Sequence, residues 1–278
     1  MRGPKLIAID LDGTLLHDDG TLSKRNVEAI SKALSLGVEV VLASGRMFRT
    51  ILPYARRLNL TGPIIAYNGA LAKVISTGEV LSHTPIPPEI AGEIVDHCLT
   101  KGIHLNFYLN EQVYVQRING WSRLYDSRTG SRSRRLDLVK LKGNAPTKLL
   151  VIDHPSKIDG LLAEFRSLLD NRLYFLKTMP EYIEFMNKGV SKGKALRDIM
   201  DRLGMNRREV AVIGDGNNDI PMMEEAGISV AMGNATNEVK DMADYVVGSN
   251  EEDGVAEAIE ILTRRPLSQP LLFSRSIS

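Results

Sequence analysis

Residues 6–16 read LIAIDLDGTLL, a short apolar run that stops at two acids and a glycine. Residues 6–9 are partly β-branched and too few for a helix, so they predict a buried strand. A helix is expected next, with Ser23 as its N-cap and Gly37 as its C-cap. The apolar side chains of that helix share one face: Val27, Ile30 and Leu34.

The pattern of a buried strand followed by polar residues recurs along the chain. Further apolar runs of strand length lie at residues 38–43, 63–67, 210–213, 228–232 and 245–247. Helical patterns separate most of these runs, and the strands are apolar on both faces. This alternation predicts a parallel sheet in an α/β layer fold.

The middle of the chain has a different pattern, which begins after a predicted hairpin at residues 70–82 and a cluster of prolines. Helices are expected there at residues 89–101 and 157–169. Strands are expected at residues 104–108, 112–116, 148–152, 172–177 and 182–186. The stretch before residue 148 is predicted to be irregular. Paired strands with single helices favour an α+β module with one covered sheet face.

We therefore predict an inserted domain at residues 84–187. The α/β domain is then discontinuous and consists of residues 1–83 and 188–264, with residues 265–278 as a tail outside both. Both segments of the α/β domain carry polar clusters. The active site must therefore be assembled from parts that are distant in sequence.

Polar clusters follow four of the predicted strands, at residues 10–14, 44–46, 68–69 and 215–219. In open α/β sheets, ligands bind beyond the carboxyl ends of the strands. A single acid at a strand end is usually a turn or cap residue. Two acid-rich clusters at one edge repel each other, however, and a bound cation relieves that repulsion. Oxygen ligands without histidine or cysteine favour Mg²⁺ over zinc.

A fifth cluster, Ser191 and Lys192, begins a helix that is expected to run to Leu203 and to end at Gly204. Ser191 is a suitable N-cap, whereas a cation in the first turn opposes the helix dipole. A lone lysine at such a position is most often solvated. Beside a magnesium–carboxylate site it would instead hold an anion. With a serine hydroxyl and a glycine amide, it describes a phosphoryl pocket.

Taken in order, these clusters resemble the four motifs of the haloacid dehalogenase superfamily. The motifs here are DLDGTL at 10–15, SGR at 44–46, Lys192, and GDGNND at 214–219. The large insert between the second and third motifs is similar to the Cof-type subfamily IIB, and the resemblance covers about residues 4–262. Ser44 stands where many relatives carry threonine, which preserves the hydroxyl group. The resemblance implies a Rossmann-like α/β core with a parallel sheet, an inserted α+β cap of type C2B, and phosphatase activity.

The resemblance also implies the roles of the acids. Asp10 would be the nucleophile that attacks phosphorus to give an aspartyl phosphate. Asp12 would protonate the leaving alkoxide and then deprotonate the hydrolytic water. Mg²⁺ would be held by Asp10, by the carbonyl group of Asp12 and by the side chain of Asp215. Asp219 would lie behind the metal or on a water bound to it.

The resemblance further implies a set of residues that hold the substrate. The phosphate group would be bound by Leu11, Ser44, Gly45, Lys192 and Asn218. Asn218 could alternatively orient Asp219. Thr14 would fix the loop after the nucleophile, and Arg46 and Asn68 are candidate substrate contacts.

Composition excludes some partners. The 278 residues include 35 Lys and Arg against 34 Asp and Glu, without the basic excess of a nucleic-acid binder. No apolar stretch reaches the roughly 20 residues that cross a membrane. We therefore expect neither nucleic acid nor membrane as a partner. The single cysteine, Cys98, cannot form an internal disulfide, and the N-terminal apolar run is too short for a secretory signal, so we expect a cytoplasmic protein.

The predicted cap would exclude water and contact the leaving group. Polar and aromatic residues on its strands are the candidate contacts: Asn106, Tyr108, Tyr182 and Glu184. Residues 122–142 carry seven Lys and Arg against two Asp. The favoured interpretation of this stretch is a solvated basic surface. The alternative is that its charge attracts anionic substrates. Trp121 is a candidate anchor for the cap or for a dimer, and the sequence leaves a monomer and a homodimer open.

The sequence therefore predicts a Mg²⁺-dependent phosphatase for small phosphorylated metabolites, with sugar phosphates as the leading class. A phosphotransferase or phosphomutase would keep the chemistry and change the acceptor. A receiver-like switch protein would keep a long-lived phosphate on Asp10. Asp12 and the large cap argue against the switch, because a receiver needs neither. Intact acids at the motif positions argue against a protein that binds ligand without turnover.

Overall fold

Strand β1 (Leu6–Asp10) is buried along its whole length and pairs in parallel with a strand on each side. The computed structural model describes residues 3–264, which cluster into two units. Among these residues, the first unit comprises 3–43, 54–62 and 196–264. Its strands follow the order β14-β13-β12-β1-β2, and every pair among them is parallel. The other four strands are β2 (Glu39–Ala43), β12 (Val210–Gly214), β13 (Ile228–Ala231) and β14 (Tyr245–Val246). The predicted α/β layer fold is confirmed.

Helices α1 (Lys24–Ser35) and α6 (Lys192–Leu203) begin at the predicted serine caps, but one predicted C-terminal end differs from the structure. Helix α1 starts at Ser23, whose side chain accepts the backbone N–H of Asn26. The predicted C-cap was wrong by one residue, because the C-cap is Leu36 and Gly37 follows it at φ +79°. The remaining helices of this unit are α7 (Ile220–Glu225), α8 (Asn237–Met242) and α9 (Gly254–Arg264). Helix α6 (Lys192–Leu203) begins after Ser191, as predicted, and Gly204 ends it at φ +63°.

The second unit comprises Ser44–Pro53 and Pro63–Ala195 and contains two sets of strands. The first set is an antiparallel meander of β3 (Pro63–Ala66), β4 (Leu71–Val74) and β5 (Val80–His83). The second is a six-stranded sheet with the order β10-β11-β9-β6-β7-β8. Its strands are β6 (His104–Leu109), β7 (Gln112–Val115), β8 (Arg134–Arg135), β9 (Lys148–Ile152), β10 (Leu173–Met179) and β11 (Tyr182–Asn187). Helix α2 (Phe48–Arg57) and helix α6 are each divided between the two units.

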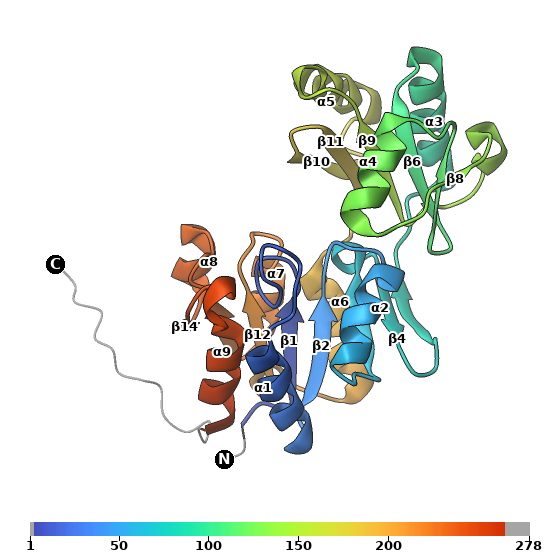
Figure 1. Ribbon diagram of the computed structural model, residues 1–278. Helices are drawn as coiled ribbons and strands as arrows, with labels where there is room; N and C mark the ends of the chain where they lie inside the picture. The colour runs from blue at the N-terminus through green and yellow to red at the C-terminus, as the bar shows by residue number, and fades with distance from the viewer. Residues whose placement is uncertain (1–2, 265–278) are drawn as a thin grey trace. The chain divides into compact units, whose positions relative to one another are not determined.

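One face of the six-stranded sheet packs against α3 (Pro88–Lys101) and α5 (Pro155–Leu169) (Figure 1). The buried side chains between them include Ile94, Phe107 and Phe165. The prediction of a single covered face is wrong, because residues of the opposite face, among them Tyr108 and Leu150, are also buried. Cys98 is part of this core, and burial raises the pKa of its thiol, so it is packed rather than reactive.

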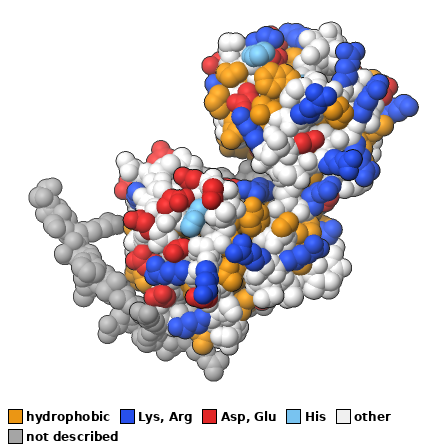
Figure 2. Space-filling view, in the orientation of Figure 1, with side chains coloured by type: hydrophobic (Ala, Val, Ile, Leu, Met, Phe, Trp, Pro, Cys, Tyr) orange, Lys and Arg blue, Asp and Glu red, His pale blue; other side chains and the backbone are white. Residues whose placement is uncertain are grey.

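The stretch before residue 148 is not irregular throughout, which corrects that prediction. It contains helix α4 (Gly120–Thr129), capped by Asn119 and Ser122, each of which accepts the other's backbone N–H. Trp121 packs edge-on against His154 with ring centroids 5.0 Å apart, and therefore anchors α4 to the residue before α5. The seven Lys and Arg of residues 122–142 are exposed. Figure 2 shows basic side chains on the side of this unit where Figure 1 places β8.

The predicted domain borders at 83/84 and 187/188 stay a prediction, because the second unit takes in residues 44–53 and 63–83 as well. The predicted tail at 265–278 lies outside the described residues. None of the helices within residues 3–264 is long and apolar enough to cross a membrane.

Candidate active site

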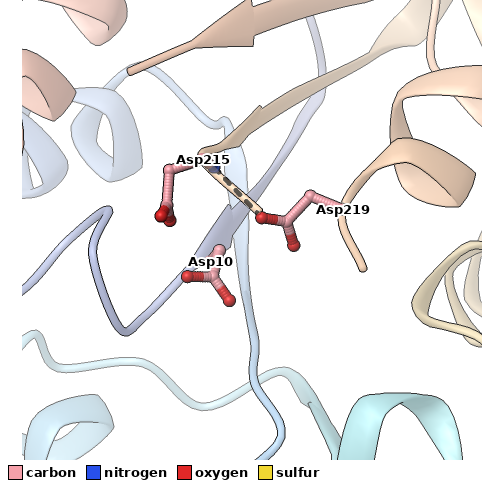
Figure 3. Close-up of side chains that lie close together, drawn as sticks. All are labelled: Asp10, Asp215 and Asp219. Atoms are coloured by element: carbon pink, nitrogen blue, oxygen red, sulfur yellow. Dashed lines mark hydrogen bonds between the residues drawn. The ribbon is translucent and has the colours of Figure 1, made fainter. Parts of the chain in front are cut away.

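Three carboxylates converge in the first unit: Asp10, Asp215 and Asp219. Asp10 ends β1 and Asp215 follows β12, and these strands are parallel neighbours with Ile9 opposite Ile213. Their carboxyl ends therefore deliver both acids to one edge of the sheet. Asp219 is the N-cap of α7. One carboxylate oxygen from each of the three acids lies within 4.8 Å of the others (Figure 3).

This group of acids fits a hard divalent cation. Asp10 is 5% exposed and Asp219 is fully buried, while Asp215 is half-buried. Carboxylates this close repel each other more strongly when water is excluded, unless a cation neutralises them. The donors are all oxygens, which suits Mg²⁺. Among the described residues, no histidine belongs to such a group.

The loop after β1 is shaped around Asp215. The hydroxyl of Thr14 donates to a carboxylate oxygen of Asp215 at 2.6 Å. Gly13 has φ +80°, and a Cβ there would lie 2.6 Å from the same carboxylate. A glycine is therefore required on both counts. Asp12 lies in this loop with an exposed side chain, and Leu11 beside it is fully buried.

Asp219 has a second task besides its place among the acids. One of its oxygens accepts the backbone N–H groups of Asp215 and Gly216, at 3.1 and 3.0 Å. This contact fixes the turn that carries Asp215. The sequence-based role of Asp219, behind the metal rather than on it, stays a prediction, and Asn218 beside it is exposed.

Three asparagines that sequence reasoning missed hold the nucleophile loop. The side-chain amide of Asn26 donates to the carbonyl of Leu15 at 3.3 Å, and that of Asn234 donates to Gly13 at 2.7 Å. The amide of Asn250 donates to the carbonyl of Leu16 at 3.1 Å. Asn26 and Asn250 are buried. The local sequence around these asparagines does not indicate this role. In two of the three contacts the partners are more than 200 residues apart in the sequence.

Replacement of Asn250 by alanine is expected to lower both stability and turnover. The change leaves the buried carbonyl of Leu16 without this donor, at a cost of about 1–3 kcal/mol. Urea unfolding measures the loss of stability, and kcat at a temperature where the variant is folded measures the effect on the loop. Ser35→Ala, which removes an exposed hydrogen bond on α1, is the control and should change neither. An Asn250→Ala variant with wild-type kcat would show that the loop does not depend on this contact.

The second unit brings together the other predicted residues. The loops after β2 and β3 are hydrogen-bonded to each other, because Ser44 O accepts the N–H of Asn68 at 3.0 Å and Arg46 O accepts that of Tyr67 at 2.9 Å. Ser44 Oγ also accepts the N–H of Arg46 at 3.1 Å. A Cβ on Gly45 would lie 3.1 Å from the amide of Asn68. Ser44, Gly45, Arg46 and Asn68 therefore form one cluster, as their places at strand ends predicted.

The start of α6 belongs to the same cluster. Gly69 has φ +101°, and a Cβ there would lie 2.1 Å from the carbonyl oxygen of Ser191 and 3.0 Å from the N–H nitrogen of Lys192. Ser191 caps the helix by accepting the N–H of Lys194 at 3.1 Å. Lys192 is 1% exposed, so the interpretation of a solvated lysine is wrong. A lysine is rarely buried to this degree without a charged or polar partner.

The fold and the site define a haloacid dehalogenase-like hydrolase. The family model of that description matches residues 7–259, and the chain belongs to this family. Among its relatives is the 5-amino-6-(5-phospho-D-ribitylamino)uracil phosphatase YitU of Bacillus subtilis, which is 30% identical over 92% of this chain and 97% of that protein.

Two solved structures extend the comparison. TM0651 from Thermotoga maritima has a TM-score of 0.88 and 34% identity over 96% of this chain and 100% of its own. The subclass IIB sugar phosphatase BT4131 has a TM-score of 0.77 and 25% identity over 92% of this chain and 98% of its own. The resemblance found in the sequence is confirmed, and so is the α/β fold with an inserted cap.

Proposed function

We propose that this protein is a Mg²⁺-dependent phosphatase that hydrolyses small phosphorylated metabolites, sugar phosphates foremost, through an aspartyl phosphate formed on Asp10. The observation that carries the proposal is the group of three carboxylates on Asp10, Asp215 and Asp219. Two similar proteins support the substrate class, because one is described as a sugar phosphatase and the other acts on a phosphorylated ribityl chain.

The carboxylates divide the reaction between them. Asp10 attacks phosphorus and displaces the alkoxide, and Asp12 donates the proton that the alkoxide takes up. Asp12 then removes a proton from the water that hydrolyses the aspartyl phosphate. Because the side chain of Asp12 is exposed, an incoming substrate can meet it. Asp10, the Asp12 carbonyl and Asp215 would hold Mg²⁺, which would supply a positive charge that offsets the repulsion between carboxylate and phosphate.

The remaining predicted residues bind and orient the substrate. Leu11, Ser44, Gly45, Lys192 and Asn218 are proposed to hold the phosphoryl oxygens as charge moves onto them. Arg46 and Asn68 are proposed substrate contacts. Their support is the hydrogen-bonded cluster of the second unit, which contains Ser44, Gly45, Arg46 and Asn68.

Release of inorganic phosphate tests the proposal. We expect release from hexose and pentose monophosphates and from phenyl phosphate with Mg²⁺, and loss of at least about 10³-fold with excess EDTA. Release without any added acceptor separates hydrolysis from transfer to a second hydroxyl. Phosphate that stays on Asp10, seen by mass spectrometry of the intact protein, would instead support the switch. A folded, Mg²⁺-supplied protein that releases none from any substrate contradicts the proposal.

A further inference from the structure

The six-stranded sheet of the second unit has a second face, opposite α3 and α5. In a strand, successive side chains alternate between faces. The register pairs Tyr108 of β6 with Lys148 of β9, and Leu150 of β9 with Glu184 of β11. These four residues therefore share a face with Asn106 of β6. The alternate residues of the same strands, such as Phe107 and Phe185, lie in the apolar core.

An ion pair is buried on this second face. Lys148 Nζ lies 3.2 Å from Glu184 Oε1, and the two side chains are only 5% and 15% exposed. The same ammonium group lies 5.0 Å from the ring centroid of Tyr108. Burial lowers the pKa of Lys148, but Glu184 and the nearby tyrosines more than offset this and hold it above the ordinary lysine value. Lys148 therefore stays charged.

Stability does not explain this pair. A buried ion pair is often no more stabilising than apolar side chains of similar volume. Two polar atoms beside it, Asn106 Nδ2 and Tyr108 OH, are buried without a hydrogen bond of acceptable geometry to any residue within 3–264. Tyr125 and Asn106 are close enough to Tyr108 to influence the pKa of its hydroxyl. Neither of them, however, forms a hydrogen bond of acceptable geometry with that hydroxyl. Buried polar groups in this state destabilise a fold, so a binding role is the better explanation.

Aromatic rings connect this face to the cluster that holds Ser44 and Asn68. Tyr67, the residue before Asn68, meets Tyr108 edge-on with ring centroids 6.2 Å apart. Tyr108 in turn meets Tyr125 of α4 edge-on at 6.1 Å. Tyr67 is fixed in place because its hydroxyl donates to Glu111 at 2.9 Å. Two side chains, Tyr108 and Tyr67, thus link Lys148 to the loop that contains Asn68.

We propose that Lys148 and Glu184, with Asn106, select the leaving group, and that they select an uncharged one rich in hydroxyl groups. The inference rests on the proposed function. Lys148 and the amide of Asn106 donate hydrogen bonds, and Glu184 accepts them, which suits hydroxyl groups that do both. Because Glu184 neutralises Lys148, the pair offers no net charge to a second phosphate or a carboxylate. Arg128 at the edge is likewise paired with Glu181.

A double variant separates binding from stability. Lys148→Met with Glu184→Leu removes both charges together, so no unpaired charge from this pair remains in the sheet. We expect kcat/KM for hexose monophosphates to fall by at least about tenfold, mainly through KM, as expected when hydrogen bonds to substrate hydroxyls are lost. Phenyl phosphate has no such hydroxyls, and its kcat/KM should change by less than about threefold. Thermal unfolding should show a midpoint no lower than that of the wild type.

The matched control is Arg172→Met with Glu93→Leu, which removes an ion pair on the α3 side of the same unit. It should leave both substrates unchanged. A second variant, Glu184→Gln, keeps a hydrogen-bond acceptor and exposes the charge of Lys148. Its ratio of kcat/KM for a sugar bisphosphate over the monophosphate should rise by at least about tenfold.

The outcomes separate the two proposals. If the wild type releases phosphate but the hexose-to-phenyl ratio is the same in the wild type and the double variant, the selection by Lys148 and Glu184 is wrong and the phosphatase stands. An unchanged bisphosphate ratio in Glu184→Gln also contradicts the selection, including where the double variant does not fold. A wild type without phosphate release overturns both.

Discussion

Asp10→Asn is expected to lower kcat/KM for phosphate release by about 10⁴-fold or more, because an amide of the same shape is a very poor nucleophile. The fold should survive. Asp10 lies at the end of β1, and the amide that replaces its carboxylate also relieves the repulsion from Asp215 and Asp219. Circular dichroism and thermal unfolding of the variant check this point.

Two further variants make the test specific. Asp10→Ala shows whether residual activity in Asp10→Asn comes from slow deamidation back to aspartate. Asp12→Asn keeps the nucleophile but loses the proposed base for the second step. With an aryl phosphate, whose leaving group needs little protonation, we expect this variant to accumulate phosphate on Asp10, visible as a mass increase on the peptide that contains residues 6–14. An Asp10→Asn protein within about tenfold of wild-type activity would remove Asp10 from the role of nucleophile.

The sheet and the acid cluster could be predicted because local sequence determines both. Strands such as β1 and β12 are buried on both faces, so they read as unbroken apolar runs. In a parallel sheet the residues after such strands meet at one edge. Asp10 and Asp215 could thus be placed together although they are far apart in the sequence.

Other features depend on tertiary contacts and had no local signal. Helix α4 buries only Ser122 and Tyr125, so it lacks the apolar periodicity by which a helix is recognised. Lys192 stands in a first helical turn, where a lone lysine is most often solvated, so only its place among the ordered motifs indicated a role, and its burial comes from packing. Asn250 is an ordinary polar residue until its amide meets the carbonyl of Leu16.

Asp215→Asn and Asp219→Asn are expected to differ sharply in their need for Mg²⁺. Asp215 is the proposed Mg²⁺ ligand, and its carboxylate also accepts a hydrogen bond from the hydroxyl of Thr14. The amide oxygen of asparagine is uncharged and a weaker Mg²⁺ ligand than a carboxylate oxygen. The Mg²⁺ concentration for half-maximal activity should therefore rise by at least about 100-fold. Asp219 already uses one oxygen to accept the N–H groups of Asp215 and Gly216. Asparagine at position 219 can accept the same two hydrogen bonds. Because Asp219 is proposed only to support the ligand Asp215, Asp219→Asn should raise the Mg²⁺ requirement by about 10-fold or more, but by less than Asp215→Asn does.

Binding of Mg²⁺ can also be measured independently of turnover. Mg²⁺ that binds the folded protein raises its stability by RT ln(1 + [Mg²⁺]/Kd), about 2.7 kcal/mol at 100 times the Kd. The thermal midpoint of the wild type should therefore rise with Mg²⁺, and that of Asp215→Asn should rise only at far higher concentrations. Asp219 decides between two arrangements of the site, because its carboxylate is near enough to the other two to bind the ion directly. If the two variants lose Mg²⁺ stabilisation to the same extent, Asp219 is a ligand and its assignment to a place behind the metal is wrong.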